Sequence, residues 1–317
     1  MNKKRNALIQ LIILVALGFA VILTMVLPQM SNGRKTAAPP EISVVIRESD
    51  STPWSNARLG MEQAAGELGA ELRFLTLATT NDAAEQEELL SREIEGGADA
   101  LVVVSADPEH LSGRLKETVG QHPVVAMESP LDGAALTVIP DNEALGRELA
   151  KSVLEDWTGG VVLLLDTGGN STGVSARMEA ARQALEAAGV PVQRRISRAA
   201  ALGGVLTGLT QETEAAQVMA FEPAATEQAA AAKESGGLTQ PLYGVGMTAD
   251  IAAGLERGTV SAVVTWSDYA AGYLAVEGAI RAAQGVSYKA EALPFFLVRG
   301  EDMYDPDNQK LLFPVTS

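Results

Sequence analysis

From Glu41 onward, short runs of Val, Leu and Ile alternate with stretches whose apolar residues recur at helical spacing. The short runs are typical of strands that are buried on both faces. They predict strands at 43–47, 71–77, 99–104, 122–127, 136–139, 161–166, 192–196, 217–221, 242–245 and 262–265. The helical spacing predicts helices over 54–68, 83–94, 110–119, 143–157, 174–188 and 270–283, with further helices between the later strands.

This alternation predicts an α/β fold of parallel sheets with helices on both faces. The pattern restarts near Asp141, which indicates two doubly wound lobes joined by a hinge. We expect the first lobe to comprise residues 41–140 plus 267–292, and the second 141–266 plus 293–317. The chain would then cross between lobes near Asp141, Trp266 and Leu293. A ligand is expected between the lobes, at the carboxyl ends of the strands.

The first forty residues have a different character. Residues 7–27 are almost entirely apolar, long enough to cross a hydrocarbon core, and they follow Lys3, Lys4 and Arg5. This predicts a cytoplasmic basic end at 1–6, a transmembrane anchor at 7–28 and a linker at 29–40, with the bulk of the chain outside the cytoplasm. A cleaved signal peptide is the alternative, although no small-x-small cleavage site follows the apolar run.

Composition narrows the possible chemistry. The chain has 317 residues, a formal net charge of −16, no cysteine and only two histidines. The acidic balance disfavours nucleic acid as a partner, because binding to phosphates requires Lys and Arg. The lack of cysteine excludes disulfides and thiol chemistry, and a lipoprotein would also need a cysteine. We expect no metal and no cofactor.

One segment matches a catalytic motif. Residues 169–173 read G-N-S-T-G, the pattern of a hydrolase nucleophile elbow, and lie between a predicted strand and a predicted helix. In that fold the histidine follows the serine along the chain, whereas His110 and His122 both precede Ser171. We therefore expect no catalytic residue and no enzyme, and we expect Ser171 or Thr172 to cap the following helix. A hydrolase that uses Ser171 is the remaining alternative.

Seven segments, in order and in register, resemble the sugar-binding branch of the type 1 periplasmic binding proteins, which includes ribose- and galactose-binding proteins. They are STPWSN (51–56), NDAAEQ (81–86), EGGADAL (95–101), VVAMESP (124–130), PDNEALG (140–146), GTVSAVV (258–264) and EDMYDPDNQKLLFP (301–314). The resemblance implies the two-lobed binding-protein fold and a small-molecule ligand in its cleft.

The resemblance also implies a set of ligand-binding residues. The residues at the matching positions are Trp54, Asp107, Glu128, Ser175, Arg177, Glu222, Thr248 and Trp266. Aromatic rings suit the C–H face of a sugar, and carboxylates accept hydrogen bonds from its hydroxyls. Three carboxylates without a cation beside them would favour an amino sugar or another cationic solute. Structural roles remain open alternatives: sheet-end packing for the tryptophans, lobe or cap contacts for Glu128 and Glu222, and an ion pair for Arg177.

The function implied by the resemblance is an extracytoplasmic, membrane-tethered binding protein that delivers its ligand to an ABC permease. Closure of the lobes about the hinge would present the bound ligand. The alternative is a sensor that presents the ligand to a membrane receptor. A cytoplasmic repressor is excluded, because an apolar segment stands where DNA-binding helices would lie.

Overall fold

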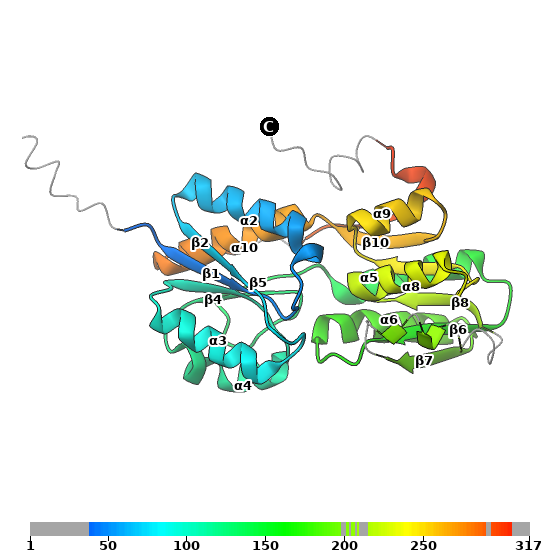
Figure 1. Ribbon diagram of the computed structural model, residues 1–317, viewed down its shortest axis with the longest axis horizontal. Helices are drawn as coiled ribbons and strands as arrows, with labels where there is room; N and C mark the ends of the chain where they lie inside the picture. The colour runs from blue at the N-terminus through cyan, green and yellow to red at the C-terminus, as the bar shows by residue number, and fades with distance from the viewer. Residues whose placement is uncertain are drawn as a thin grey trace, which may run out of the picture. The chain divides into compact units, whose positions relative to one another are not determined.

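A computed structural model describes residues 38–197, 201–202, 204–206, 208, 215–289 and 293–305. The predicted anchor at 7–28 lies outside these residues, as do most of the linker and the end of the tail. In the described part of the chain, no helix is both long and apolar enough to cross a membrane. The described residues from Pro40 onward belong to one compact unit, which contains two sheets (Figure 1).

The first lobe is built on a five-stranded parallel sheet in the order β2-β1-β3-β4-β5. Its strands are β1 (Glu41–Val45), β2 (Glu71–Leu75), β3 (Ala100–Val104), β4 (Val124–Met127) and β5 (Leu136–Val138). One face is covered by α2 (Ser55–Leu68) and α10 (Asp268–Ala283), the other by α3 (Ala83–Glu95) and α4 (Pro108–Val119). A short 3-10 helix, η1 (Thr52–Trp54), leads into α2.

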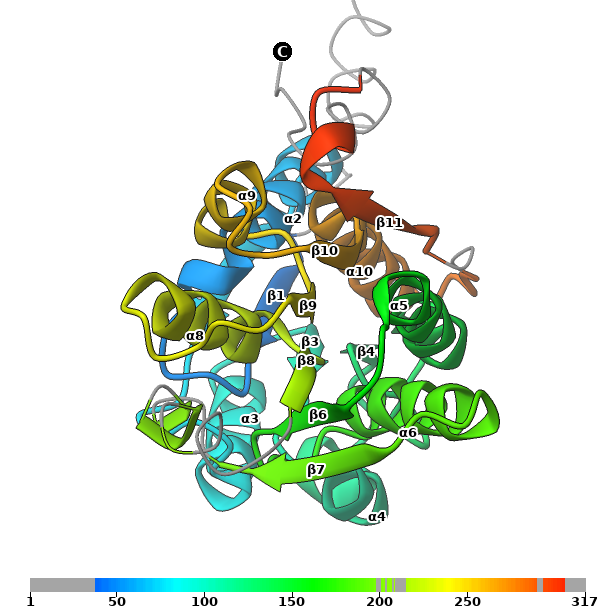
Figure 2. The same cartoon turned by 90° about the vertical axis from the view of Figure 1, so that its right-hand side faces the viewer.

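The second lobe is built on a six-stranded sheet in the order β11-β10-β9-β8-β6-β7 (Figure 2). Its strands are β6 (Val161–Asp166), β7 (Val192–Ile196), β8 (Ala215–Ala220), β9 (Leu242–Val245), β10 (Ala262–Trp266) and β11 (Phe295–Arg299). On one face lie α5 (Asn142–Asp156) and α6 (Thr172–Ala187), and on the other α8 (Pro223–Glu234) and α9 (Ala249–Glu256). The predicted α/β fold with parallel sheets in two lobes is confirmed. The exception is β11, which pairs antiparallel with β10 and was not predicted; η3 (Gly300–Asp302) follows it.

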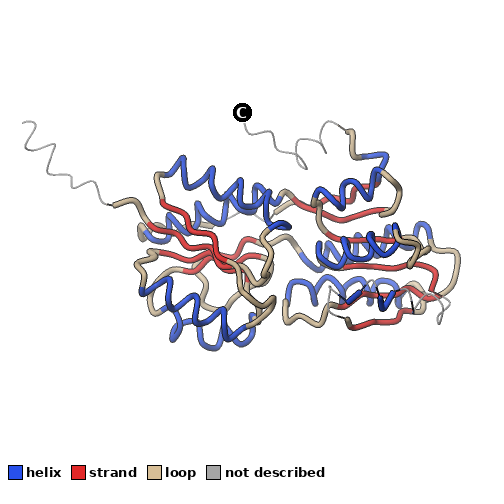
Figure 3. Tube along the Cα trace, viewed as in Figure 1, coloured by secondary structure: helices blue, strands red, loops and turns tan. Residues whose placement is uncertain are grey.

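The chain passes between the sheets at three places (Figure 3). It leaves the first sheet between β5 and α5, returns at Ser267 between β10 and α10, and enters the second sheet again at β11. Pro140 and Leu293 pair in an isolated parallel bridge, so the first and third crossings lie side by side. Such short, adjacent connections are where a rotation of one lobe against the other can be absorbed.

Helix starts place polar side chains at the carboxyl ends of the strands. In six of the described helices the residue before the first turn accepts a hydrogen bond from the backbone N–H three residues further on, which satisfies one of the free donors of the helix. These residues are Asp82, Asp107, Asp141, Ser171, Thr248 and Ser267. The same edges of the two sheets therefore carry both the caps and the candidate site.

Two glycines fix the helix that begins beside the site. A Cβ at Gly272 of α10 would lie 2.0 Å from the carbonyl oxygen of Ala57, and one at Gly60 of α2 would lie 2.0 Å from that of Tyr269. Only glycine permits the two helices to approach this closely. The packing holds the first turn of α10 against the helix that follows Trp54.

Candidate functional site

A cavity of about 60 Å³ lies between the two lobes, and we call it the central cavity. One water needs roughly 10–15 Å³ by this measure, so the space holds a handful of water-sized groups. Its apolar wall includes Trp54, Trp266, Met127, Val138 and three prolines. Its charged groups are Arg47, Glu48, Glu128, Glu222 and Asp268.

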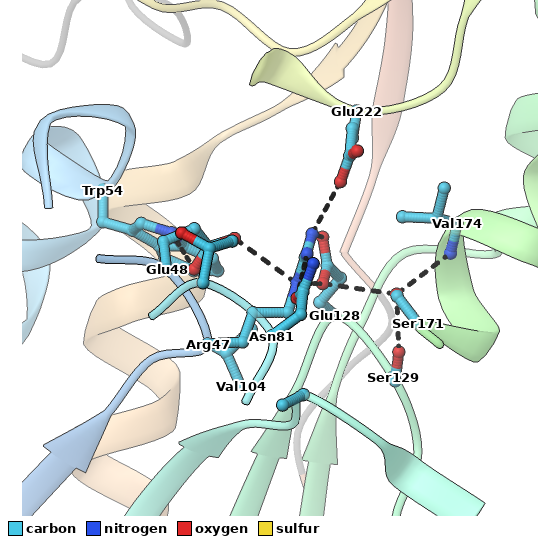
Figure 4. Close-up of polar contacts among 12 residues, drawn as sticks. Arg47, Glu48, Trp54, Asn81, Val104, Glu128, Ser129, Ser171, Val174 and Glu222 are labelled. Atoms are coloured by element: carbon cyan, nitrogen blue, oxygen red, sulfur yellow. Dashed lines mark hydrogen bonds and ion pairs between the residues drawn. The ribbon is translucent and has the colours of Figure 1, made fainter. Parts of the chain in front are cut away.

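Arg47 lies at the centre of the charged groups (Figure 4). Its Nε donates to Glu128 Oε2 over 2.8 Å and its Nη2 donates to Glu222 Oε2 over 2.7 Å. Its Nη1 donates to Asn81 Oδ1 over 2.9 Å, and Glu48 Oε1 lies 3.3 Å from its Nε. Glu222 follows β8 of the second lobe, whereas Arg47 and Glu128 belong to the first, so this ion pair ties the lobes together.

Arg47, Glu128 and Glu222, which we call the Arg47 cluster, are almost inaccessible to solvent. Their side chains are 5%, 8% and 7% exposed. Burial alone would lower the pKa of Arg47, but the carboxylates of Glu128, Glu48 and Glu222 outweigh it and raise that pKa well above its ordinary value. Burial alone would likewise raise the pKa of Glu128, but Arg47 and Arg177 hold it below its usual value. Arg47 and Glu128 therefore stay ionised at neutral pH.

Two other carboxyl groups of the cavity behave differently. Burial, only partly offset by Arg47 and by a hydrogen bond from Trp54, raises the pKa of Glu48 to about 7. Burial, partly offset by Arg177, raises the pKa of Asp268 to about 7. Near neutral pH both groups are therefore poised to gain or lose a proton, in contrast to Glu128.

These two raised pKa values predict how stability depends on pH. Between about pH 4 and pH 7 the folded chain holds protons on Glu48 and Asp268 that the unfolded chain has released, so stability should fall as the pH rises through this range. At about 1.4 kcal/mol per pKa unit, each group contributes on the order of 3 kcal/mol. Thermal unfolding of the full chain at a series of pH values measures this effect. The double variant Glu48→Gln/Asp268→Asn should flatten the profile, and an unchanged slope would contradict the assignment.

A second set of contacts joins the lobes beside the Arg47 cluster. Ser171 caps α6, as predicted, by accepting from Val174 N. Its hydroxyl also lies 3.0 Å from Ser129 Oγ and donates to Glu128 Oε2 over 3.3 Å. Gly173 N donates to Ser129 Oγ over 3.1 Å. The amino end of α6 is thus hydrogen-bonded to residues 128–129 of the first lobe.

The histidines lie away from Ser171. His110 pairs with Glu87 over 2.7 Å, and His122 Nδ1 lies 2.9 Å from the carbonyl oxygen of Val119. Both of these contacts are within the first lobe, on the α3–α4 side. Among the described residues, no cluster of His, Asp and Glu side chains could hold a metal ion.

Four of the eight predicted ligand residues line the central cavity: Trp54, Glu128, Glu222 and Trp266. Trp54 Nε1 donates to Glu48 Oε2 over 3.0 Å, which orients the ring in the cavity wall (Figure 4). Glu128 has a φ of 64°, a left-handed conformation that is unusual outside glycine and is often found at functional sites.

The other four do not line the cavity. Asp107 caps α4 and accepts from Asn170 Nδ2 of the second lobe over 2.6 Å. Thr248 caps α9 and bonds to Glu227, and Ser175 is exposed on α6. Asp107 and Thr248 follow strands and precede helices, as ligand residues of this fold would, but that place in the chain also suits a helix cap.

Arg177 lies behind the cavity wall. It is fully buried, with Nε donating to Asn142 Oδ1 over 2.7 Å and Nη1 to the carbonyl oxygen of Phe221 over 3.1 Å. Its guanidinium carbon is 4.9 Å from the ring centroid of Trp266, a cation–π contact. Burial lowers the pKa of Arg177. Arg177 thus positions Trp266 from the side of the second lobe.

The expectation of carboxylates without a cation beside them is wrong for Glu128 and Glu222. Glu128 and Glu222 are both paired with Arg47, and Asp107 is bonded to Asn170. Sequence reasoning missed Arg47 because it was assigned to the end of a strand, whereas β1 ends at Val45. Glu48 and Asp268 were also missed. The available indication for all three was their position at a strand end or helix start on the edge that carries the site.

The sequence pattern described as "Periplasmic binding protein domain" matches residues 42–287, which is most of the chain. The chain belongs to the periplasmic binding protein family. Within this family domain lie both sheets except β11, the whole Arg47 cluster and both cavity tryptophans. No curated protein sequence matches the chain significantly.

Solved structures share the fold of this periplasmic binding protein domain. A carbohydrate-transporter solute-binding protein from Agrobacterium radiobacter, in complex with D-arabinose, is 17% identical with a TM-score of 0.79, over 87% of this chain and 99% of that one. An ABC-transporter solute-binding protein from Agrobacterium vitis, bound to α-D-tagatopyranose, is 18% identical with a TM-score of 0.78, over 87% and 100%. A structure described as a XylFII–LytSN complex is 17% identical in sequence with a TM-score of 0.73, over 84% of this chain and 100% of that one.

Proposed function

We propose that this chain is an extracytoplasmic solute-binding protein that captures a small sugar-like ligand between its lobes and delivers it to an ABC importer. The observation that carries the proposal is the central cavity, in which two tryptophans and four carboxyl groups from both lobes converge. Similar structures solved with D-arabinose and α-D-tagatopyranose support a sugar as the ligand class.

The chemistry of the wall fits such a ligand. Trp54 and Trp266 offer flat apolar surfaces for the C–H face of a ring. Arg47 offers N–H donors, and Glu128 and Glu222 offer acceptors, for hydroxyl groups. A sugar that binds here would share hydrogen bonds with the Arg47 cluster, because Glu128 and Glu222 both already accept hydrogen bonds from Arg47.

Transport would follow from closure of the lobes. The Arg47–Glu222 pair brings groups of both lobes together inside the cavity, so a ligand that bonds to both lobes at once favours the closed arrangement over an open one. The three crossings between the lobes supply the hinge. A permease that recognises the closed form would receive the ligand, and an anchor at 7–28 would raise the local concentration of the binder at the membrane.

Presentation to a receptor is a second candidate. The fold is shared with a XylFII–LytSN complex, in which a protein of this architecture was solved together with another protein. Capture of the ligand would be the same in both cases, and only the membrane protein that recognises the closed form would differ. Pull-down of the full chain with an ABC permease, compared with pull-down of a receptor, separates the two.

A thermal-shift screen of the full chain against pentoses and hexoses tests the proposal. A ligand at about 100 times its Kd stabilises the protein by about 2.7 kcal/mol, which is on the order of 5 °C or more. We expect at least one sugar to give this shift. A flat response to every sugar would contradict the proposed function.

Replacing Trp54 by alanine should weaken binding of that sugar by at least about 30-fold, because a ring-stacking anchor contributes about 2 kcal/mol or more. Isothermal titration calorimetry measures the change. The matched control is Trp157→Ala, since Trp157 ends α5 outside the cavity and donates to the carbonyl oxygen of Gly160. Equal losses in both variants would mean that Trp54 acts only through the fold.

A further inference from the structure

Asp268 differs from the other carboxyl groups of the central cavity. Glu128 and Glu222 accept hydrogen bonds from Arg47, and Glu48 lies within ion-pair distance of it. Asp268 lines the same cavity, but among the described residues no cation lies within ion-pair distance of its carboxylate and no hydrogen bond to its side chain is found. It is the first residue of α10, after the cap Ser267.

The charges of the cavity do not balance. Its lining contains four carboxyl groups and one cation, Arg47, which is already shared among three of them. The nearby Arg177 is not part of the lining. It attracts the Asp268 carboxylate from beyond ion-pair distance and only partly offsets its burial. The carboxyl group that remains without a partner is that of Asp268.

The surroundings of Asp268 favour a cation from outside the chain. Burial, only partly offset by Arg177, raises its pKa to about 7, so the ionised form is less favourable here than in water. A cation beside it would remove this penalty. Trp266, two residues earlier, and Trp54 line the same cavity, and aromatic rings attract cations.

We infer that Asp268 is the anionic partner of an ammonium group on the ligand, so that the cavity prefers an amino sugar to the neutral sugar of the same shape. The inference rests on the proposed function, because it assigns a ligand class to the same cavity. Asp107, Glu128 and Glu222 are less suited to this role, because their carboxylates have partners within the chain.

The pairing has a pH signature. An ammonium group requires Asp268 to be ionised, so affinity for an amino sugar should fall about tenfold per pH unit between pH 7 and pH 5, as the carboxylate takes up its proton. Affinity for a neutral sugar has no such requirement. Glu48 gains a proton over the same range, whereas Arg47 and Glu128 keep their charges, so a variant of Asp268 is needed to assign the effect.

The test uses the full chain and matched probes: D-glucosamine with D-glucose, and D-galactosamine with D-galactose. Calorimetry should show that one amino sugar binds at least tenfold more tightly than its neutral counterpart at pH 7. Asp268→Asn should remove this preference, because it should weaken binding of the amino sugar at least tenfold more than binding of its neutral counterpart. The control is Asp250→Asn, which removes an exposed carboxylate from the first turn of α9, outside the cavity.

The outcomes are distinct. Neutral sugars that bind as tightly as their amino counterparts would overturn the inference and leave the proposed function standing. Equal losses for both members of a pair in Asp268→Asn would assign Asp268 a structural role in the helix start, and would also overturn it. If Asp268→Asn does not fold, a flat pH profile of amino-sugar affinity in the unaltered chain overturns the inference. Binding of no sugar of either kind would overturn the proposed function and the inference together.

Discussion

Replacing Arg47 by alanine should lower the free energy of unfolding by about 3–5 kcal/mol, because it leaves Glu128 and Glu222 buried without a counter-charge. The midpoint of thermal unfolding should then fall by on the order of 10 °C. Denaturant unfolding of the full chain measures the change. The loss should be smaller in acid than at pH 8, since the orphaned carboxylates can then be protonated.

An exposed ion pair provides the control for Arg47→Ala. Arg147 and Glu143 pair across one turn of α5 with side chains 54% and 70% exposed, and such pairs contribute about 0.5 kcal/mol or less. Arg147→Ala should therefore leave the unfolding midpoint nearly unchanged. A loss below about 1 kcal/mol in Arg47→Ala would show that the Arg47 cluster is hydrated in solution. It would then contribute little to holding the lobes closed.

Replacing Gly173 by alanine should weaken ligand binding by at least about tenfold while each lobe keeps its fold. A Cβ at Gly173 would lie 2.1 Å from the carbonyl oxygen of Glu128, so the amino end of α6 could no longer rest on the first lobe. The contacts of Ser171 and Gly173 with Ser129 would be lost with it. Small-angle scattering should show a larger radius of gyration, and calorimetry the lower affinity.

Gly66→Ala is the matched control for Gly173→Ala. Gly66 also lies in a helix, α2, but a Cβ there would meet nothing within 4 Å. That substitution should be neutral or should stabilise the chain by up to about 1 kcal/mol, because alanine favours a helix over glycine. If Gly173→Ala bound the ligand as tightly as Gly66→Ala, the closed arrangement of α6 on Glu128 would not be the binding form.

The sequence predicted the fold well because its strands are buried on both faces. β3 has the sequence ALVVV and β6 the sequence VVLLLD, and such runs between amphipathic helices have few other interpretations. β11 was missed for a physical reason. It is an antiparallel edge strand that follows a helix of the other lobe, so the strand–helix alternation gives it no place.

The site was predicted less completely. Trp54 and Trp266 were predicted from the resemblance to sugar-binding proteins, and both line the cavity. Asp107 and Thr248 were also predicted from the resemblance, but both cap helices, and a matching position does not distinguish a cap from a ligand contact. Arg47 could not be foreseen as the partner of Glu128 and Glu222, because that pairing joins segments 81 and 175 residues apart.

The position of α10 in the chain determines the order in which the lobes can be completed. The face of the first sheet that bears Ile42, Val44, Val102 and Val125 is covered by a helix that the ribosome makes after nearly all of the second sheet. Until residues 268–283 have been synthesised and exported, that apolar face lacks half of its cover. Such long-range pairing slows folding and exposes apolar surface meanwhile. The lobe that begins first must therefore finish late, and the hinge can form only when both halves are present outside the cytoplasm.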